Sequence, residues 1–296
     1  HIDSLTKASG VTALSELIWN SLDADATEIN IEFKLTRLGG YEYIKLKDNG
    51  HGLTYENAQL VFSKLGGSEK KLRNQSPSGR HYHGKEGKGR YKSLALGDLV
   101  KFTSVYNSNG SNSIFTATID RNQLSTTEIS DLKKLKKGDG NPGFTVEIDN
   151  VNLKTAQQAL IFENRKELEE KFASYWISYP LFKIYFNGNE LEFDSLIKNS
   201  DQAQIKVEDG ETSHKFILKI IEWTFENKKK TFLCNTQGIP FTETNLGIRS
   251  SIPISLFIQS SFIEKLHRDN VLDFFESNEI LSKVLKIARD FTKDYL

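Results

Sequence analysis

The sequence predicts an α+β protein of two domains, and three observations support this prediction. Apolar residues recur at helical spacing near both ends of the chain, in residues 11–25 and 275–295. Between them lie short stretches rich in β-branched and aromatic residues, which are typical of strands. Near residue 152 a strand-rich half gives way to a second helical pattern and a further set of strands. The predicted domains are therefore residues 1–152 and 153–296.

The composition is that of a folded chain without excess charge. Of 296 residues, 38% are hydrophobic, which is enough to bury a core. Lys plus Arg and Asp plus Glu both number 39, and this balance argues against a protein that coats nucleic acid over its whole surface. The single cysteine, Cys234, suits a cytoplasmic or nucleoid-associated location. No apolar run reaches the roughly 20 residues that cross a bilayer, so no membrane partner is expected. The lack of any methionine indicates a piece of a longer protein.

The first elements are a helix and a pair of strands. Residues 11–25 carry apolar side chains at helical spacing, with Thr12 as the predicted N-cap. The stretches 28–35 and 42–48 alternate as strands do, and Gly39-Gly40 joins them in a hairpin-like turn.

The rest of the first half alternates between strands and polar loops. A short helix is expected at 55–64, and the glycine-rich, basic stretch 66–90 cannot pack a core and is predicted to be a long mobile loop. A small helix near 90–97 should follow it. The remaining predictions are three strands, at 99–106, 113–120 and 143–149, and a solvated lysine-rich loop at 132–143.

The second half opens with a helical pattern over 155–178, which ends before Pro180. Residues 181–193 predict a hairpin, because Asn187-Gly188 is a strong turn signal. Further strands are expected at 203–208, 214–225 and 230–235, and an amphipathic helix should close the chain at 275–295.

The first group of polar residues that suggests chemistry lies on the first helix. Glu16, Asn20 and Asp23 share one face, because residues four and seven apart stack. An amide oxygen together with phosphate oxygens suits Mg²⁺, and a glutamate one turn away could activate water. Taken alone, this pattern favours an ordinary solvated face of an amphipathic helix.

The second group is Asp48-Asn49-Gly50-His51-Gly52, directly after a strand. A carboxylate at a strand end can accept a hydrogen bond from an exocyclic amine, and Gly50 and Gly52 let the backbone approach a flat base. An ordinary β-turn uses the same residues.

The third group is the glycine-rich segment 83–93, with glycines at 84, 87 and 89 and lysines at 85, 88 and 92. Exposed N–H groups at a helix start, together with these lysines, would attract an anion. The spacing is not that of a Walker loop or of a Rossmann turn. The alternative is a flexible basic loop.

Together, in this order and within 80 residues, the three motifs resemble the GHKL superfamily: gyrase B, the clamp-like heat-shock chaperones, histidine kinases and MutL. Residues 66–70 and 92–97 look most like its MORC-like branch. The resemblance implies a GHKL (Bergerat) ATP-binding α/β sandwich, followed by a transducer-like (S5-like) α/β domain with a C-terminal helix.

The resemblance also implies residue roles and the cofactors ATP and Mg²⁺. Glu16 would be the general base, Asn20 the Mg²⁺ ligand, and Asp48 the partner of the adenine amino group. Gly52 would make room for the base, and Thr145 would support Asp48 through water. The other nucleotide-binding candidates are Asp23, Gly50, Ser68, Lys70, Gly84, Lys85, Gly87, Lys88 and Gly89, most of them on a lid spanning 66–90.

Several functions fit this resemblance. The expected one is a slow, Mg²⁺-dependent ATPase clamp that dimerises on binding ATP, within a larger MORC-like, DNA-associated or defence protein. A non-hydrolysing regulatory module and a chaperone-like ATPase with protein clients remain alternatives, whereas no phospho-accepting histidine supports a histidine kinase. DNA stays an open partner: Lys133–Lys137 and Lys228–Lys230 offer basic patches, although solvated charge is the commoner explanation of such lysines.

Overall fold

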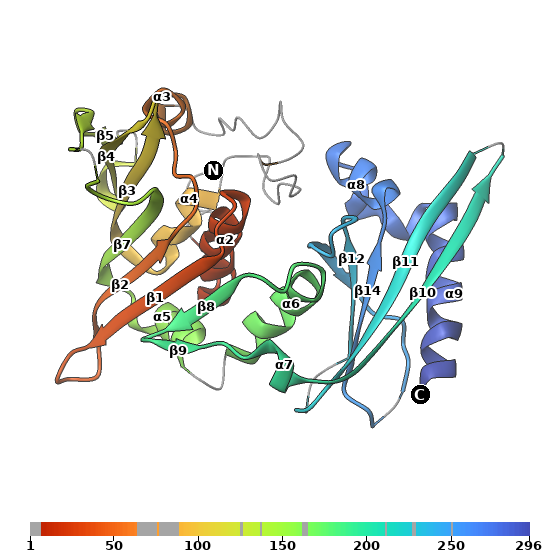
Figure 1. Ribbon diagram of the computed structural model, residues 1–296. Helices are drawn as coiled ribbons and strands as arrows, with labels where there is room; N and C mark the ends of the chain where they lie inside the picture. The colour runs from red at the N-terminus through yellow and green to blue at the C-terminus, as the bar shows by residue number, and fades with distance from the viewer. Residues whose placement is uncertain are drawn as a thin grey trace. The chain divides into compact units, whose positions relative to one another are not determined.

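The computed structural model confirms the predicted α+β class (Figure 1). It describes residues 7–63, 76, 89–124, 127–136, 138–161, 165–210, 212–226, 229–249 and 251–296. Most of the predicted lid therefore lies outside the described residues. The chain divides into two compact units, residues 1–168 with 181–191, and residues 169–180 with 192–296.

The first unit is built on a nine-stranded sheet among the described residues, in the order β5-β4-β3-β7-β2-β1-β8-β9, with β6 pairing with β4. Neighbouring strands are antiparallel except β1 and β8, which run parallel. The strands are β1 Glu28–Leu35, β2 Tyr41–Asp48, β3 Gly97–Ser108, β4 Ser111–Asp120, β5 Glu128–Ile129, β6 Lys133–Lys134, β7 Gly143–Val151, β8 Lys183–Phe186 and β9 Asn189–Glu190.

The β8–β9 hairpin extends the first unit beyond residue 152, because β8 pairs with β1 in the first sheet. Its turn is the predicted one: Asn187 and Gly188 both have positive φ, 46° and 80°, as a tight hairpin of this kind requires.

The helices of the first unit are labelled beside its sheet in Figure 1. Besides the 3-10 turns η2 Ser93–Ala95 and η3 Arg121–Gln123, they are α2 Gly10–Asp23, α3 Tyr55–Ser63, α4 Gly89–Lys92 and α5 Leu153–Leu160, with the start of α6 Arg165–Ser178. Helix α2 packs against α4, η2 and α5.

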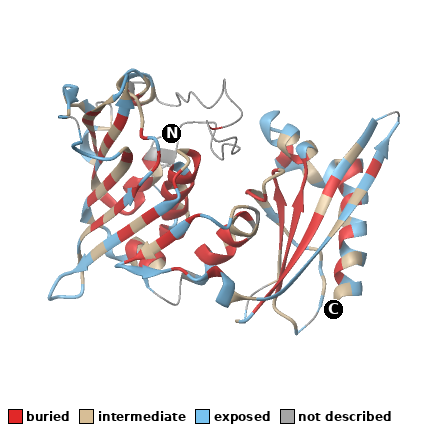
Figure 2. Cartoon of the chain, viewed as in Figure 1, coloured by how far each residue is buried: buried red, intermediate tan, exposed pale blue. Residues whose placement is uncertain are grey.

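One face of the sheet is apolar and the other is charged. In β2, Ile44, Leu46 and Asp48 are buried, while the alternating lysines are more exposed, and Figure 2 shows this alternation along the strands. On the charged face, Glu147 of β7 accepts ion pairs from Lys45 at 3.2 Å and Lys101 at 3.6 Å. An antiparallel sheet with one wet face explains this pattern.

Helix α2 is fixed at its start by a cap and by a close contact. Its N-cap is Ser9, whose hydroxyl accepts the N–H of Thr12 at 3.2 Å, so the predicted cap at Thr12 is wrong by three residues. A Cβ on Gly10 would lie 1.9 Å from the carbonyl oxygen of Thr155, so only glycine fits there against α5. The helix therefore begins at a defined place beside α5.

The second unit contains a mixed sheet in the order β10-β11-β14-β12-β13. One face is covered by a cluster that includes Leu218 and Leu256 of the sheet and Leu281 and Val284 of the last helix. The elements are α7 Phe193–Leu196, β10 Ile197–Asp209, β11 Thr212–Trp223, β12 Lys230–Cys234, β13 Pro240–Thr244, β14 Ile254–Gln259, α8 Ser261–Arg268, η5 Leu272–Ser277 and α9 Glu279–Tyr295.

The other face of this sheet carries a buried polar network that joins it to α6. Ser255 of β14 accepts from Trp223 Nε1 at 2.9 Å and donates to Glu170 Oε1 at 2.6 Å. Lys230 of β12 donates to Glu170 Oε2 at 3.1 Å, so the buried carboxylate is both paired and hydrogen-bonded.

The structure also differs from the sequence predictions in detail. The single helix predicted over 155–178 is described as two, α5 and α6, and the lysine-rich loop contains the short strand β6. Strands β13 and β14 and helix α8 were not predicted. Among the described residues, no helix is long and apolar enough to span a membrane.

Candidate functional site

Asp48 is the buried polar centre of the first unit. It ends β2 on the apolar face and is 4% exposed. Its Oδ1 accepts the backbone N–H of Gly50 at 2.9 Å and of Phe144 at 3.1 Å, and its Oδ2 accepts the hydroxyl of Ser21 at 2.7 Å. Burial raises the pKa of Asp48, and these three donors partly oppose that rise.

The hydrogen bonds leave Asp48 with spare accepting capacity. An ionised carboxylate has about four acceptor sites, and the described donors fill three of them. One site on Oδ2 therefore remains for a donor from outside the described residues. A primary amine would supply such a donor, whereas a carbonyl oxygen would not.

The turn after Asp48 is held between α2 and β3. The N–H of His51 donates to the carbonyl oxygen of Ala24 at 2.9 Å. A Cβ on Gly50 would lie 2.6 Å from that same oxygen, and one on Gly52, where φ is +72°, would lie 2.3 Å from the carbonyl oxygen of Val105. Both glycines are thus required by the packing of the turn itself, a constraint that the sequence alone did not reveal.

The structure corrects the predicted support of Asp48 by Thr145. Thr145 pairs with Lys47 in the β2–β7 register, so its side chain leaves the sheet on the face opposite to Asp48. The residue of β7 that contacts Asp48 is Phe144, through its backbone N–H. The error arose because the sequence motif does not fix strand register, and a shift of one residue exchanges the two faces.

Phe144 also brings an aromatic ring to the Asp48 side of the sheet. Its ring centroid lies 6.0 Å from that of Phe102, which lies 5.4 Å from that of Phe62 on α3. Phe144 is half-buried, so this aromatic row ends at a partly open position next to Asp48. Sequence reasoning missed this residue.

Helix α2 carries the other predicted side chains beside Asp48. The hydrogen bond from Ser21 to Asp48 fixes the last turns of α2 against the end of β2. Asn20 is exposed and Glu16 is half-buried one turn earlier, whereas Asp23 is 4% exposed. From the helical rise, Asn20 and Glu16 lie about 1.5 Å and 7.5 Å along the axis from Ser21. All three side chains therefore lie on α2, and Asp23 is the buried one.

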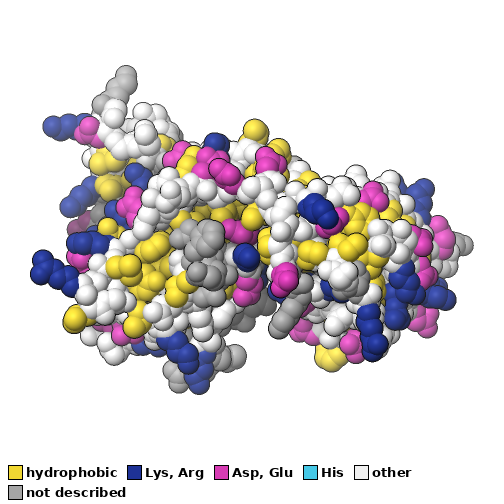
Figure 3. Space-filling model, turned by 90° about the horizontal axis from the view of Figure 1, so that it is seen from below, with side chains coloured by type: hydrophobic (Ala, Val, Ile, Leu, Met, Phe, Trp, Pro, Cys, Tyr) yellow, Lys and Arg dark blue, Asp and Glu magenta, His cyan; other side chains and the backbone are white. Residues whose placement is uncertain are grey.

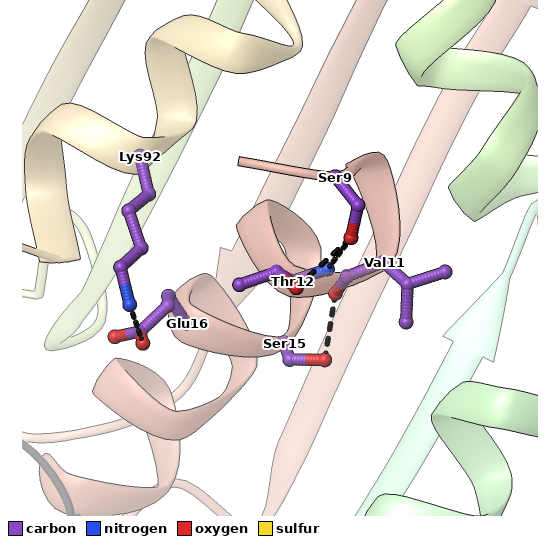
Figure 4. Close-up of polar contacts among 6 residues, drawn as sticks. All are labelled: Ser9, Val11, Thr12, Ser15, Glu16 and Lys92. Atoms are coloured by element: carbon purple, nitrogen blue, oxygen red, sulfur yellow. Dashed lines mark hydrogen bonds and ion pairs between the residues drawn. The ribbon is translucent and has the colours of Figure 1, made fainter. Parts of the chain in front are cut away.

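Glu16 forms an ion pair with Lys92 of α4, as Figure 4 shows. The two side chains are 18% and 29% exposed, so the pair is partly shielded from water. In the same view, Ser9, Thr12 and Ser15 bond within the first turns of α2. The sequence placed Lys92 among the basic residues of the glycine-rich segment but gave no sign of this partner.

The glycine-rich segment leads into a helix, as predicted: Gly89 is the first residue of α4. The other candidates of the lid and glycine loop, Ser68, Lys70, Gly84, Lys85, Gly87 and Lys88, lie outside the described residues.

The described part of the site thus combines three chemical features around α2 and the end of β2. Asp48 offers one hydrogen-bond acceptor, Phe144 an apolar surface, and Asn20 and Glu16 an amide and a carboxylate farther along α2. Such an arrangement can bind a planar amine-bearing ring at one end and act on polar groups at the other.

Comparison with known proteins gives a family match for the first half of the chain. Residues 8–152 match the family described as "Histidine kinase-, DNA gyrase B-, and HSP90-like ATPase". The matched range includes Glu16, Asp48 and Lys92.

Two relatives resemble short parts of the chain. A putative type II restriction enzyme, HgiDII of Herpetosiphon aurantiacus, is 32% identical over 91 residues, which are 31% of this chain and 13% of the relative. The DNA mismatch repair protein MutL of Thermosipho africanus is 49% identical over 53 residues, which are 18% of this chain and 9% of the relative. The matches thus span only a small part of these relatives.

The ATPase region of Saccharomyces cerevisiae topoisomerase II is a solved structure of similar arrangement. Its complex with ICRF-187 aligns with a TM-score of 0.48 at 13% identity, covering 84% of this chain and 73% of that one. From the family match and the motifs, residues 8–152 are an ATP-binding domain of the GHKL superfamily.

Proposed function

We propose that this chain binds ATP with its adenine on Asp48 and hydrolyses it slowly with Glu16 as general base. The observation that carries this proposal is the hydrogen bond between Ser21 and Asp48. It joins the end of β2 to α2, which supports a single site that contains both the base-binding acceptor and the Glu16–Asn20 face. The remaining acceptor position on Asp48 suits the amino group of adenine and disfavours a base with a carbonyl at that position.

Asn20 is the residue that would hold Mg²⁺. Its side chain is exposed one turn from Glu16, and its amide oxygen is a hard donor of the kind that Mg²⁺ takes together with phosphate oxygens and water. When bound, the ion would neutralise charge on the phosphates.

Glu16 would act on the attacking water. Its carboxylate would accept a proton from the water, whose oxygen would bond to the γ-phosphorus as the bond to the β-phosphate oxygen breaks, giving ADP and phosphate. General-base catalysis contributes typically 10²–10⁴-fold. Thr145 is not part of this proposal, because it lies on the face of the sheet opposite to Asp48. Asp23, Gly50, Gly52 and Gly89 are proposed neighbours of the nucleotide.

The test of hydrolysis is the Glu16→Ala protein. It should retain ATP affinity and lose about 10²-fold or more of its turnover, measured by calorimetry and by phosphate release. A parental rate in Glu16→Ala would remove Glu16 as the base. No turnover in the parent, with ATP still bound, would instead indicate the non-hydrolysing regulatory module.

We also propose that ATP drives dimerisation of this module within a larger DNA-associated protein of the MORC-like kind. Its support is the sequence resemblance, together with two relatives whose names concern DNA, a mismatch repair protein and a putative restriction enzyme. A lid over residues 66–90 remains part of the proposal from sequence alone.

Size measurement with and without a non-hydrolysable ATP analogue tests the dimer, because a clamp should be dimeric only with the analogue and Mg²⁺. Titration with duplex DNA at several salt concentrations tests the partner. A steep fall of DNA affinity with rising salt would support contacts to the phosphates. Figure 3 shows basic and acidic side chains interspersed on one face of the molecule. Lack of any binding at low salt would remove DNA as a direct partner of this chain.

A further inference from the structure

The ion pair between Lys92 and Glu16 joins two segments that lie 76 residues apart in the sequence. Both charged groups are partly shielded from water, where an ion pair is screened less than on an open surface. Figure 4 shows the lysine reaching from α4 to the carboxylate on α2. The contact therefore engages the group that we propose as the catalytic base.

The two segments that hold the pair are anchored independently. On the lysine side, Tyr91 and Ser93 are 2% and 0% exposed, so the backbone on either side of Lys92 is packed in the core. On the glutamate side, Leu17 and Ser15 are buried in the same way, and the helix start is fixed by Gly10. Neither end needs to reorganise for the contact to form.

We propose that Lys92 is a positioning residue for hydrolysis, which holds the Glu16 carboxylate in the orientation from which it can take a proton from water. This inference rests on the proposed function. A glutamate on a helix has several rotamers, and a general base must lie within hydrogen-bond reach of the proton that it removes. Lys92 contacts one oxygen, Oε1, and leaves Oε2 for the water.

Two other roles for Lys92 predict different kinetics. A lysine that binds the phosphates would raise the dissociation constant and KM of ATP when it is removed, with little change in kcat. A lysine that restrains an otherwise active base would raise kcat when it is removed. Of these three roles, positioning is the one that lowers kcat while ATP affinity is kept.

The experiment compares Lys92→Met and Lys92→Arg with the parent. Lys92→Met should lower kcat about tenfold and leave the ATP dissociation constant within about twofold, while Lys92→Arg, which keeps the charge, should recover most of the rate. Lys34→Met is the matched control, because it removes a lysine paired with Glu42 at 2.7 Å toward the turn end of the β1–β2 hairpin. It should leave both constants unchanged.

Three results would overturn the inference: unchanged kcat in Lys92→Met, raised kcat, or a rise in KM alone. Thermal unfolding of each variant shows whether a lost rate reflects lost folding. If Lys92→Met does not fold, Lys92→Arg tests the inference instead. Positioning by charge requires the Lys92→Arg protein to remain active and to bind ATP with the parental affinity.

A second pair of variants separates this inference from the proposed function. In a Glu16→Gln background, adding Lys92→Met should cause no further loss of rate, because the two side chains act as a unit. If Glu16→Gln keeps the parental rate, the base assignment itself fails. If Glu16→Gln is slow and Lys92→Met is not, only the role of Lys92 fails.

Discussion

Replacing Asp48 by asparagine should weaken ATP binding without unfolding the domain. The change keeps the shape of the side chain and alters only one of its two terminal atoms. In the parent protein, Oδ1 lies 2.9 and 3.1 Å from the backbone nitrogens of Gly50 and Phe144. The amide oxygen of asparagine can take the place of Oδ1 and still accept from both N–H groups. Its NH₂ then replaces Oδ2, and the hydroxyl of Ser21 can turn to accept from it.

The variant should therefore keep three hydrogen bonds between position 48 and the rest of the protein. The variant also removes a carboxylate whose pKa is raised by burial, so the loss of charge relieves part of the desolvation cost. We expect the free energy of unfolding to change by no more than about 1 kcal/mol.

The bound nucleotide meets a different surface. Where Oδ2 accepted the adenine amino group, an NH₂ now faces another NH₂, and neither can accept. A hydrogen bond to a charged group contributes about 1.5–3 kcal/mol. Since each 1.4 kcal/mol is tenfold, the affinity for ATP should fall roughly 10- to 150-fold.

Calorimetric titration with ATP and with its inosine analogue provides the assay, alongside thermal unfolding without nucleotide. The inosine base carries a carbonyl in place of the amino group, so the preference for ATP over the analogue should shrink in Asp48→Asn. Ser21→Ala is the control, because it removes one donor to Asp48 and keeps the carboxylate. Parental ATP affinity in a folded Asp48→Asn protein would refute the assignment of Asp48.

Three further predictions follow from the same structure. Gly52→Ala should lower the free energy of unfolding by about 1–3 kcal/mol more than Gly188→Ala does. Both glycines have positive φ, 72° and 80°, but of the two only Gly52 would bring a Cβ against a carbonyl oxygen, at 2.3 Å. Equal losses of stability in urea unfolding would contradict this explanation. Lys230→Met should cost about 3–5 kcal/mol, because it removes a cation that is paired with the buried carboxylate of Glu170. Lys198→Met removes a far more exposed lysine of the same sheet and should cost much less in the same assay. ATP affinity should decline as pH falls through the raised pKa of Asp48, because the protonated carboxyl loses an acceptor. The decline should therefore occur at a higher pH than for an ordinary aspartate. An ATP affinity that stays constant down to the pH range in which aspartate usually titrates would contradict this prediction.

Local pattern determined much of this protein. Helical spacing predicted α2, alternation predicted β1 and β2, and Asn187-Gly188 predicted the turn between β8 and β9. The three motifs, by order and spacing, indicated the GHKL superfamily, which the family match over residues 8–152 confirms. These features depend on residues close together in the chain, where sequence is most informative.

The sequence did not determine the contacts between residues that are far apart in the chain. The position of Thr145 on the wrong face follows from strand register, which the hydrogen-bond ladder between β2 and β7 sets and the motif does not. The contact between Ser21 and Asp48, the pairing of Lys92 with Glu16, and the pairing of β8 with β1 join residues that are 27, 76 and 155 positions apart, respectively. Only the folded chain decides such contacts, because they arise from the packing of whole helices and strands. Two of them bring Asp48 and Lys92, from the second and third motifs, against the helix that carries the first.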